Sequence, residues 1–350
     1  MAYEMKSKFI RSILDLLFNQ LYNFMRVLVT GAAGLLGSNI VRVLLDQQVK
    51  PVCFVRKSTD LSTLKDLPCD FVFGSLENKE EVELAVQDCD AVIHAASIFS
   101  HPENSYDEFV KANIQGTIHV VEAVLKYNLL KFVYISTANT LAPGTKERPG
   151  IELNEFDGFH LDSNYLNSKY IAEQYVLEQV EKKGLDANII NPTFMLGAFD
   201  SKPSSGRIIT YGFNKSLIFV PPGGKNFVYV GDVAKVAVRA LSSKIKGEKY
   251  LVTGFNYTYK EFFELLLKQS GRKKKMVIIP KFLFYTAAYL MQFLRGKNIE
   301  FNISNAKVLG RDNYYSGKKA IRDFNYLPTP IELAIEEALD WFKKNRKLSY

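Results

Sequence analysis

Residues 27–37, with the sequence VLVTGAAGLLG, decide the fold of this chain. A short apolar run ends in a threonine, and glycines follow at Gly31, Gly34 and Gly37. We expect a buried strand, a tight turn at Gly31 and a helix that begins near Leu35. Such a turn lets a pyrophosphate approach the backbone at the second glycine, and lets helix and strand pack closely at the third. The stretch therefore predicts a dinucleotide site, whose contacts would come from Gly31, Gly34, Leu35, Leu36 and Gly37.

Strands and helices alternate after this stretch, which indicates an α/β fold. Short apolar runs at 51–55, 70–74, 90–96, 131–135 and 187–193 are typical of buried strands, and helical patterns at 78–87, 106–126 and 165–182 separate them. This alternation predicts a Rossmann-type, doubly wound parallel sheet whose strand ends meet at one ligand-binding edge. We expect a dinucleotide-binding domain over 25–197. A smaller C-terminal α/β part, mainly substrate-binding, would span 198–350, with about 226–245 returning to the Rossmann core.

Two apolar segments are not explained by this domain. Residues 1–24 precede the first strand and place their apolar side chains on one helical face. They predict an N-terminal amphipathic helix that packs on the body or contacts a membrane surface. Residues 282–294 are apolar on nearly every face but are shorter than a bilayer span. We expect a buried or substrate-covering helix there, with a membrane-surface role as the alternative.

Composition narrows the class of protein. The 350 residues are 47% hydrophobic and carry a net charge of +8. The basic residues at 268–275 and 343–347 lack the interleaved aromatic residues of a nucleic-acid module, so we expect solvated surface charge and no nucleic-acid partner. The three cysteines have no metal-ligand spacing, and their odd number favours reduced thiols. We therefore expect a cytoplasmic protein with no metal and no transmembrane span, although peripheral membrane contact stays open.

The end of the second predicted strand bears on cofactor choice. A carboxylate at this position binds the adenosine ribose of NAD, whereas a cation suits the 2′-phosphate of NADP. The sequence offers Arg56 and Lys57, and no acid before Asp60. It therefore favours NADP(H) over NAD(H), unless these two residues are simple surface cations.

A tyrosine and a lysine form the candidate catalytic pair. Tyr165 and Lys169 are four residues apart in a predicted helix, so they lie on one face. An ammonium group beside a phenol is expected to lower the phenol pKa toward the range of a general acid/base. The Thr137 hydroxyl, at the end of the fifth strand, could contact the same substrate oxygen. The alternative is a core tyrosine with a lysine beside it. We interpret His94 as a hydrogen-bonded strand-end residue rather than a catalytic one.

These motifs together resemble the extended short-chain dehydrogenase/reductase superfamily over residues 26–342. The branch most similar to this chain contains dihydroflavonol-reductase-like and 3β-hydroxysteroid-dehydrogenase-like proteins, many of them described only as NAD-dependent epimerase/dehydratase. The matching segments are TGAAGLLG at 30–37, HAAS at 94–97, YIST at 134–137, YLNSK at 165–169, NPTFMLG at 191–197, VYVGDVA at 228–234 and YYSGKKAIRDFNY at 314–326.

The resemblance assigns roles to individual residues. It implies that Tyr165 is the acid/base, that Lys169 holds the nicotinamide ribose, that Thr137 replaces the usual serine, and that Asn113 supports the site. Ser75 stands where the family commonly has an aspartate that contacts adenine. The remaining cofactor contacts would come from Leu76, Ala95, Ala96 and Ser97 along the nucleotide, and from Pro192 and Thr193 beside the nicotinamide.

These features favour an NADP(H)-dependent reductase/dehydrogenase of a carbonyl or alcohol. The substrate would lie between the sheet edge and the segment after Leu196. An apolar or ring-bearing substrate is expected from the aromatic residues Phe199, Tyr211, Phe213 and Phe219 and those of 282–293. One alternative is an NAD-dependent nucleotide-sugar epimerase or dehydratase, and a third is a non-catalytic dinucleotide-binding sensor or scaffold. The resemblance also implies a homodimer, paired through the helices 106–126 and 165–182.

Overall fold

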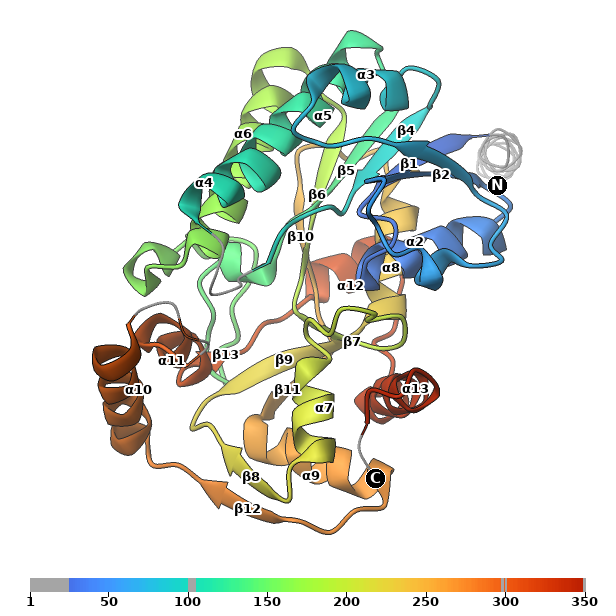
Figure 1. Cartoon of the computed structure of the whole chain (residues 1–350). Coiled ribbons are helices and arrows are strands. Elements are labelled where there is room, and N and C mark those ends of the chain that lie inside the picture. The colour runs from blue at the N-terminus through green and yellow to red at the C-terminus, as the bar shows by residue number, and fades with distance from the viewer. Residues whose placement is uncertain (1–24, 100–104, 297–298, 300, 349–350) are drawn as a thin grey trace, which may run out of the picture.

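A seven-stranded parallel sheet forms the centre of the molecule in the computed structural model, which describes residues 25–99, 105–296, 299 and 301–348 (Figure 1). The expectations for residues 1–24 lie outside the described residues. The strand order is β10-β6-β5-β4-β1-β2-β3, and every neighbouring pair is parallel. The predicted doubly wound α/β sheet is therefore confirmed. Its strands are β1 (Arg26–Thr30), β2 (Lys50–Val55), β3 (Asp70–Phe73), β4 (Ala91–His94), β5 (Lys131–Ile135), β6 (Ala187–Pro192) and β10 (Lys249–Val252).

Helices cover both faces of this sheet (Figure 1). Alternate residues of each strand point to opposite faces, so Val27 and Val29 join one core and Leu28 joins the other. The first core lies under α2 (Leu35–Asp46), α8 (Val230–Ala240) and α12 (Lys318–Phe324). The second lies under α3 (Lys79–Val86), α5 (Gly116–Lys126) and α6 (Asn164–Lys183).

The helix expected over 106–126 is present and contains a wider turn. It consists of α4 (Tyr106–Phe109), a π-helical turn at Val110–Gln115, and α5. Such wider turns occur mostly as single turns inside α-helices and often mark functional sites. Asn113 lies in this turn.

A second, smaller lobe follows the sixth strand. Strand β9 (Gly224–Tyr229) is its centre and pairs with β7 (Phe194–Leu196), β11 (Phe255–Thr258) and β13 (Asp312–Asn313). A two-stranded ribbon, β8 (Leu217–Val220) with β12 (Lys275–Ile278), extends it. The helices of this lobe are α7 (Arg207–Asn214), α9 (Tyr259–Ser270), α10 (Lys281–Arg295), α11 (Ile303–Leu309) and α13 (Ile331–Lys344).

The return to the Rossmann core differs from the range expected at 226–245. Strand β9 belongs to the sheet of the second lobe, and the chain returns only with α8, which begins at Val230. Helix α8 packs on α2, and β10 then closes the edge of the central sheet beside β6. The returning segment therefore starts later than predicted and includes a strand beyond residue 245.

Helix α10 is not the buried helix that its composition indicates. Only Phe284 and Ala288 are buried, against α11, and the rest of the helix is largely in solvent. Its apolar side chains outnumber the positions that one neighbouring helix can cover. In the part of the chain that the structure describes, no helix is long and apolar enough to cross a membrane.

Candidate active site

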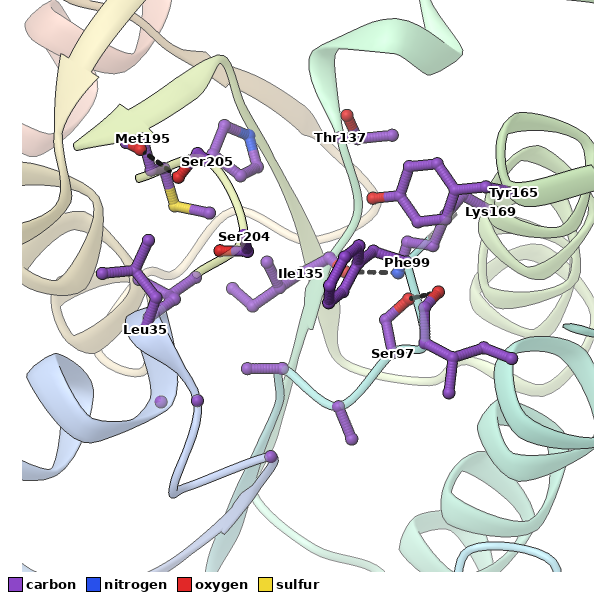
Figure 2. Close-up of a pocket in the computed structure, with 18 of the residues that line it drawn as sticks. Leu35, Ser97, Phe99, Ile135, Thr137, Tyr165, Lys169, Met195, Ser204 and Ser205 are labelled. Atoms are coloured by element: carbon purple, nitrogen blue, oxygen red, sulfur yellow. Dashed lines mark hydrogen bonds between the residues drawn. The ribbon is translucent and has the colours of Figure 1, made fainter. Parts of the chain in front are cut away.

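A cavity of about 800 Å³ opens at the carboxyl ends of the parallel strands. Figure 2 shows Leu35 of the glycine loop on one side and Thr137, Tyr165 and Lys169 on the other. Segments that follow β1, β2, β3, β4, β5 and β6 all contribute to its lining. The site is therefore at the edge that the strand order predicts.

The glycine loop leaves room that side chains would fill. Gly31 has φ 68°, and a Cβ there would lie 2.7 Å from the backbone of Ala96. A Cβ at Gly37 would lie 2.0 Å from the Gly31 carbonyl oxygen. Helix α2 starts at Leu35, beside the cavity, and its Gly34 N-cap has no side chain to pair with the first amides. These free N–H groups and the positive end of the helix fit a dinucleotide pyrophosphate.

A buried hydrogen-bond network fixes the strand ends next to this loop. The Thr30 hydroxyl lies 2.6 Å from His94 Nδ1, and His94 Nε2 lies 3.1 Å from the Thr117 hydroxyl. The amide of Ala96 donates to the same Thr30 oxygen over 3.2 Å. Burial lowers the pKa of His94 to about 3, so this imidazole is neutral. His94 is therefore a hydrogen-bonded strand-end residue, as expected.

Thr137, Tyr165 and Lys169 meet at the opposite side of the cavity (Figure 2). Thr137 lies two residues after the end of β5, and the other two come from the first turns of α6. Lys169 Nζ donates to the carbonyl oxygen of Ile135 over 2.7 Å and lies 4.3 Å from the centroid of the Tyr134 ring. The structure thus brings together the three side chains that the motifs single out.

The pKa values in this group differ from the expectation. Burial raises the pKa of Tyr165 to about 12, and hydrogen bonding to Thr137 opposes this rise. Burial lowers the pKa of Lys169 to about 7, while the negative charge of Glu173 acts in the other direction. The prediction that Lys169 lowers the phenol pKa is wrong here, because the effect of burial outweighs the one opposing contribution, which comes from Thr137. Tyr165 is a neutral phenol at neutral pH and is therefore able to donate a proton.

Asn113 lies behind the cavity rather than in its lining. Its Oδ1 accepts from the Ile98 amide over 2.9 Å and from the Ser97 hydroxyl over 3.1 Å. Its Nδ2 donates to the Ile98 carbonyl and, over 3.0 Å, to the Ser168 hydroxyl. Asn113 is thus a positioning residue that ties the loop after β4 to α6.

A second positioning group was not predicted. Glu173 lies four residues after Lys169 on α6 and is fully buried. Its Oε2 accepts from the Thr140 hydroxyl and from Asn191 Nδ2, both over 2.8 Å. The spacing of Glu173 from Lys169 was the available signal in the sequence, because residues four apart share a helix face.

The predicted nucleotide contacts mostly face the cavity. Arg56 is exposed at its rim, whereas Lys57 does not line it and is only a surface cation. Asp60 also reaches the cavity, but its carboxylate accepts from the amide and hydroxyl of Ser62 over 2.9 and 3.0 Å. The other expected contacts that line the cavity are Ser75, Leu76, Ala95, Ala96, Ser97, Pro192 and Thr193.

A family comparison agrees with this geometry. The model of the NAD dependent epimerase/dehydratase family matches residues 27–253, which include the glycine loop, the Tyr165–Lys169 pair and β9. The chain belongs to this family. It is an enzyme of the extended short-chain dehydrogenase/reductase type, among NAD(P)-dependent oxidoreductases and epimerases.

Relatives of this family member match nearly the whole chain. "Sterol demethylase protein B" of Methylococcus capsulatus is 27% identical over 91% of this chain and 99% of its own length. A "putative dihydroflavonol 4-reductase" of Synechocystis is 26% identical, covering 91% of this chain and 94% of the relative. The crystal structure of gox2253 superposes with a TM-score of 0.82 at 28% identity, covering 92% of this chain and 99% of that one.

The second lobe of this epimerase/dehydratase family member supplies the remaining wall. Met195 and Ser205 lie there beside Ser204, across from Tyr165 (Figure 2). The Ser205 hydroxyl donates to the Met195 carbonyl, and Asp200 accepts from the Ser204 amide, so the loop 200–206 is tied in place. Sequence patterns did not single out Asp200, Ser204 or Ser205, whereas Met195 lies in the NPTFMLG segment at 191–197. The remaining members of this wall include Phe194, Lys225, Val308 and Tyr315.

The aromatic residues expected around the substrate lie elsewhere. Phe213 is buried in the core of the second lobe, and the Tyr211 hydroxyl pairs with the backbone of Phe219. Phe199 packs under Arg42, whose guanidinium carbon lies 3.5 Å from the ring centroid. Phe213 thus packs within the lobe, and Phe199 packs at its junction with α2. None of the four residues Phe199, Tyr211, Phe213 and Phe219 lines the cavity.

Proposed function

We propose that the chain is an NADP(H)-dependent reductase/dehydrogenase that interconverts a carbonyl and an alcohol, with Tyr165 as the acid/base. The observation that carries this proposal is that Thr137, Tyr165 and Lys169 line one cavity together with a pyrophosphate-type glycine loop. A neutral phenol is suited to give a proton to a carbonyl oxygen during reduction, and to accept it in the reverse reaction.

Each residue of the site would have a separate role in binding or proton transfer. The glycine loop and the start of α2 would bind the pyrophosphate of the cofactor, and Lys169 would hold its nicotinamide ribose. When bound, the nicotinamide supplies or accepts the hydride. Thr137 would orient the substrate oxygen through its hydroxyl while Tyr165 moves the proton. Asn113 and Glu173 would keep the loop after β4 and helix α6 in register with these groups.

Preference for NADP(H) is supported by Arg56 at the cavity rim. Its guanidinium can bind the 2′-phosphate in a bidentate manner. The nearby Asp60 carboxylate is already paired with Ser62, which reduces its capacity to bind the ribose hydroxyls of NAD.

An apolar or ring-bearing substrate is supported by the second wall. Phe194, Met195 and Val308 give it apolar surface, Tyr315 adds a ring, and Phe99 lies across the cavity in the loop after β4. The names of two relatives, a sterol demethylase protein and a dihydroflavonol reductase, also refer to ring compounds.

The test is a fluorescence titration with NADPH and NADH, followed by turnover of a panel of alicyclic and aromatic ketones and aldehydes. We expect tighter NADPH binding, a loss of about tenfold or more in that preference for Arg56→Ala, and a loss of turnover by about 10²- to 10⁴-fold for Tyr165→Phe. Tyr170→Phe is the matched control, because Tyr170 lies on the same helix and stacks on Phe156 instead of lining the cavity. Equal affinity for the two cofactors, or full activity of Tyr165→Phe, would contradict the proposal.

One observation favours the nucleotide-sugar epimerase or dehydratase as a second candidate. Lys225 reaches the cavity from β9, and burial together with Arg311 lowers its pKa to about 8. A diphosphate would stabilise that ammonium. In this case NAD would remain bound through purification, and no net oxidation of added NADPH would be seen. The homodimer stays a prediction under either candidate.

A further inference from the structure

Helix α10 exposes a continuous apolar face at the margin of the second lobe. In Figure 1 it lies at the lower left, beside α11. Its inner side packs through Phe284 and Ala288 against Ala306 of α11. The outer side, called here the apolar face of α10, consists of Phe282, Leu283, Tyr289, Leu290, Phe293 and Leu294.

These residues form two adjacent rows along the helix. One row contains Phe282, Tyr289 and Phe293, and the other contains Leu283, Leu290 and Leu294, at the i, i+7 and i+11 spacing of one face. Phe293 is 78% exposed and Leu294 is 74% exposed. A contiguous apolar patch of this kind marks an interaction site more often than scattered single residues do.

The charged residues of the segment that carries this face have one sign. Every charged residue from 265 to 296 is basic. Lys273 and Lys275 are exposed at the start of β12, which leads directly into α10. On the same ribbon, the exposed Val277 pairs with the exposed Phe219 of β8. The basic residues of the segment are Lys268, Arg272, Lys273, Lys274, Lys275, Lys281 and Arg295.

We propose that this surface binds an anionic phospholipid bilayer, with α10 lying in the plane of the interface. Apolar side chains flanked by lysine and arginine are the combination that interfacial helices use. The helix has 15 residues, about 22 Å, so it cannot span a hydrocarbon core of about 30 Å. A second copy of the chain is disfavoured as the occupant, because a symmetric pair would place like charges opposite one another.

The position of this surface gives the binding a consequence. Helix α10 packs on α11, and Val308 of α11 lines the cavity. A bilayer under α10 would lie near the second-lobe wall, so an apolar substrate could enter from the lipid phase. This consequence rests on the proposed function, whereas the binding of lipid does not.

The experiment is co-sedimentation of the full chain with vesicles, without cofactor or substrate, so its outcome is independent of the enzymatic assay. One vesicle preparation is phosphatidylcholine alone, and the other is phosphatidylcholine mixed with phosphatidylglycerol. We expect binding to the anionic vesicles, with a loss of about tenfold or more in both Phe293→Ser/Leu294→Ser and Lys273→Glu/Lys275→Glu. Leu153→Ser/Leu327→Ser is the control, because these leucines are 86% and 85% exposed and lie outside this surface.

Three results would overturn the proposal. The first is unchanged vesicle binding by both α10-region variants, because the contact would then come from another segment. The second is equal binding of the wild type to neutral and anionic vesicles. The third is no vesicle binding together with a wild-type dimer that Phe293→Ser/Leu294→Ser converts to a monomer in light scattering, because a second copy would then cover the face. All these positions are exposed, so near-unchanged melting is expected for every variant.

Discussion

The glycine loop and the second-lobe wall enclose the same cavity, but different kinds of contact hold them. The loop is fixed by close contact between backbone segments at Gly31 and Gly37, and by the buried hydrogen-bond network from Thr30 through His94 to Thr117. The second-lobe wall combines a short loop, β9 and α11, which are far apart in sequence and are brought together by tertiary packing and by the pairing of β9 with β7 and β13. A site built from backbone contacts leaves a local sequence pattern, whereas a wall assembled from distant segments does not.

The largest loss of stability is expected at Gly37, where an added side chain would lie closest to the neighbouring backbone. Gly37→Ala would place a methyl group 2.0 Å from the Gly31 carbonyl, so we expect a loss of about 3 kcal/mol or more in stability, together with loss of cofactor binding. Gly184→Ala is the control, because Gly184 has φ 68° but nothing within 4 Å of an added Cβ. It should cost only about 1 kcal/mol. Urea unfolding measures both, and equal losses would show that close approach does not fix the loop.

A somewhat smaller change in stability, which depends on pH, is expected when Lys169 is replaced. Its pKa is lowered from 10.5 to about 7 by burial, so below pH 7 the folded chain bears the full cost of a buried ammonium. As the pH rises from 7 toward 10.5, only the unfolded chain still binds the proton, and the cost disappears. Lys169→Met should therefore raise stability below pH 7 by roughly 2 to 4 kcal/mol, and this gain should vanish near pH 10.5.

This prediction separates a charge effect from a packing effect. Lys183→Met, at the exposed end of the same helix, should give no comparable gain. A gain from Lys169→Met that is equal at every pH would indicate better packing of methionine. The variant should also lose turnover, because the site holds this ammonium at a cost in stability.

The smallest changes in stability are expected from one substitution on each side of the cavity, and these two compare the glycine loop with the second-lobe wall directly. Thr30→Val leaves His94 Nδ1 and the Ala96 amide without their partner, so we expect a loss of about 1 to 3 kcal/mol in stability and weaker cofactor binding. Ser205→Ala removes one hydrogen bond to Met195 at the more open wall and should cost about 1 kcal/mol or less. Its effect should be on the substrate KM alone. If Ser205→Ala weakened cofactor binding as much as Thr30→Val, the two sides of the cavity would not differ in this way.

The difference between a site built from local contacts and a wall built from distant segments explains which features the sequence could predict. The alternation of strands and helices, the glycine loop and the Tyr165–Lys169 pair are local sequence patterns. The structure places the loop and the pair at one cavity, at the predicted edge of the sheet. The position of aromatic side chains in the second lobe is not local, and Phe213 packs in the core instead of the cavity. The pKa of Tyr165 is raised mainly by burial of the phenol, which the spacing of Tyr165 and Lys169 does not give.

Helix α10 was misjudged for a related reason. Its apolar composition predicts burial, but whether a face is covered depends on how many neighbours the fold supplies. Of the helices in the described part of the chain, only α11 packs closely on it. Lys57 was grouped with Arg56 because the two are adjacent, although successive residues of an extended chain point to opposite sides. Glu173 had a visible i, i+4 signal, but its partners Thr140 and Asn191 come from other elements.

The π-helical turn at Val110–Gln115 makes the chain unusually sensitive to its length at this point. A π-helical turn takes up one residue more than an α-helical turn, so removing one residue would let α4 and α5 join as a regular helix without rotating either flank. The wide turn that carries Asn113 would be lost, and with it the bonds to Ile98 and Ser168, while α5 kept its packing on the sheet. A one-residue deletion here would therefore disturb the site more than the fold.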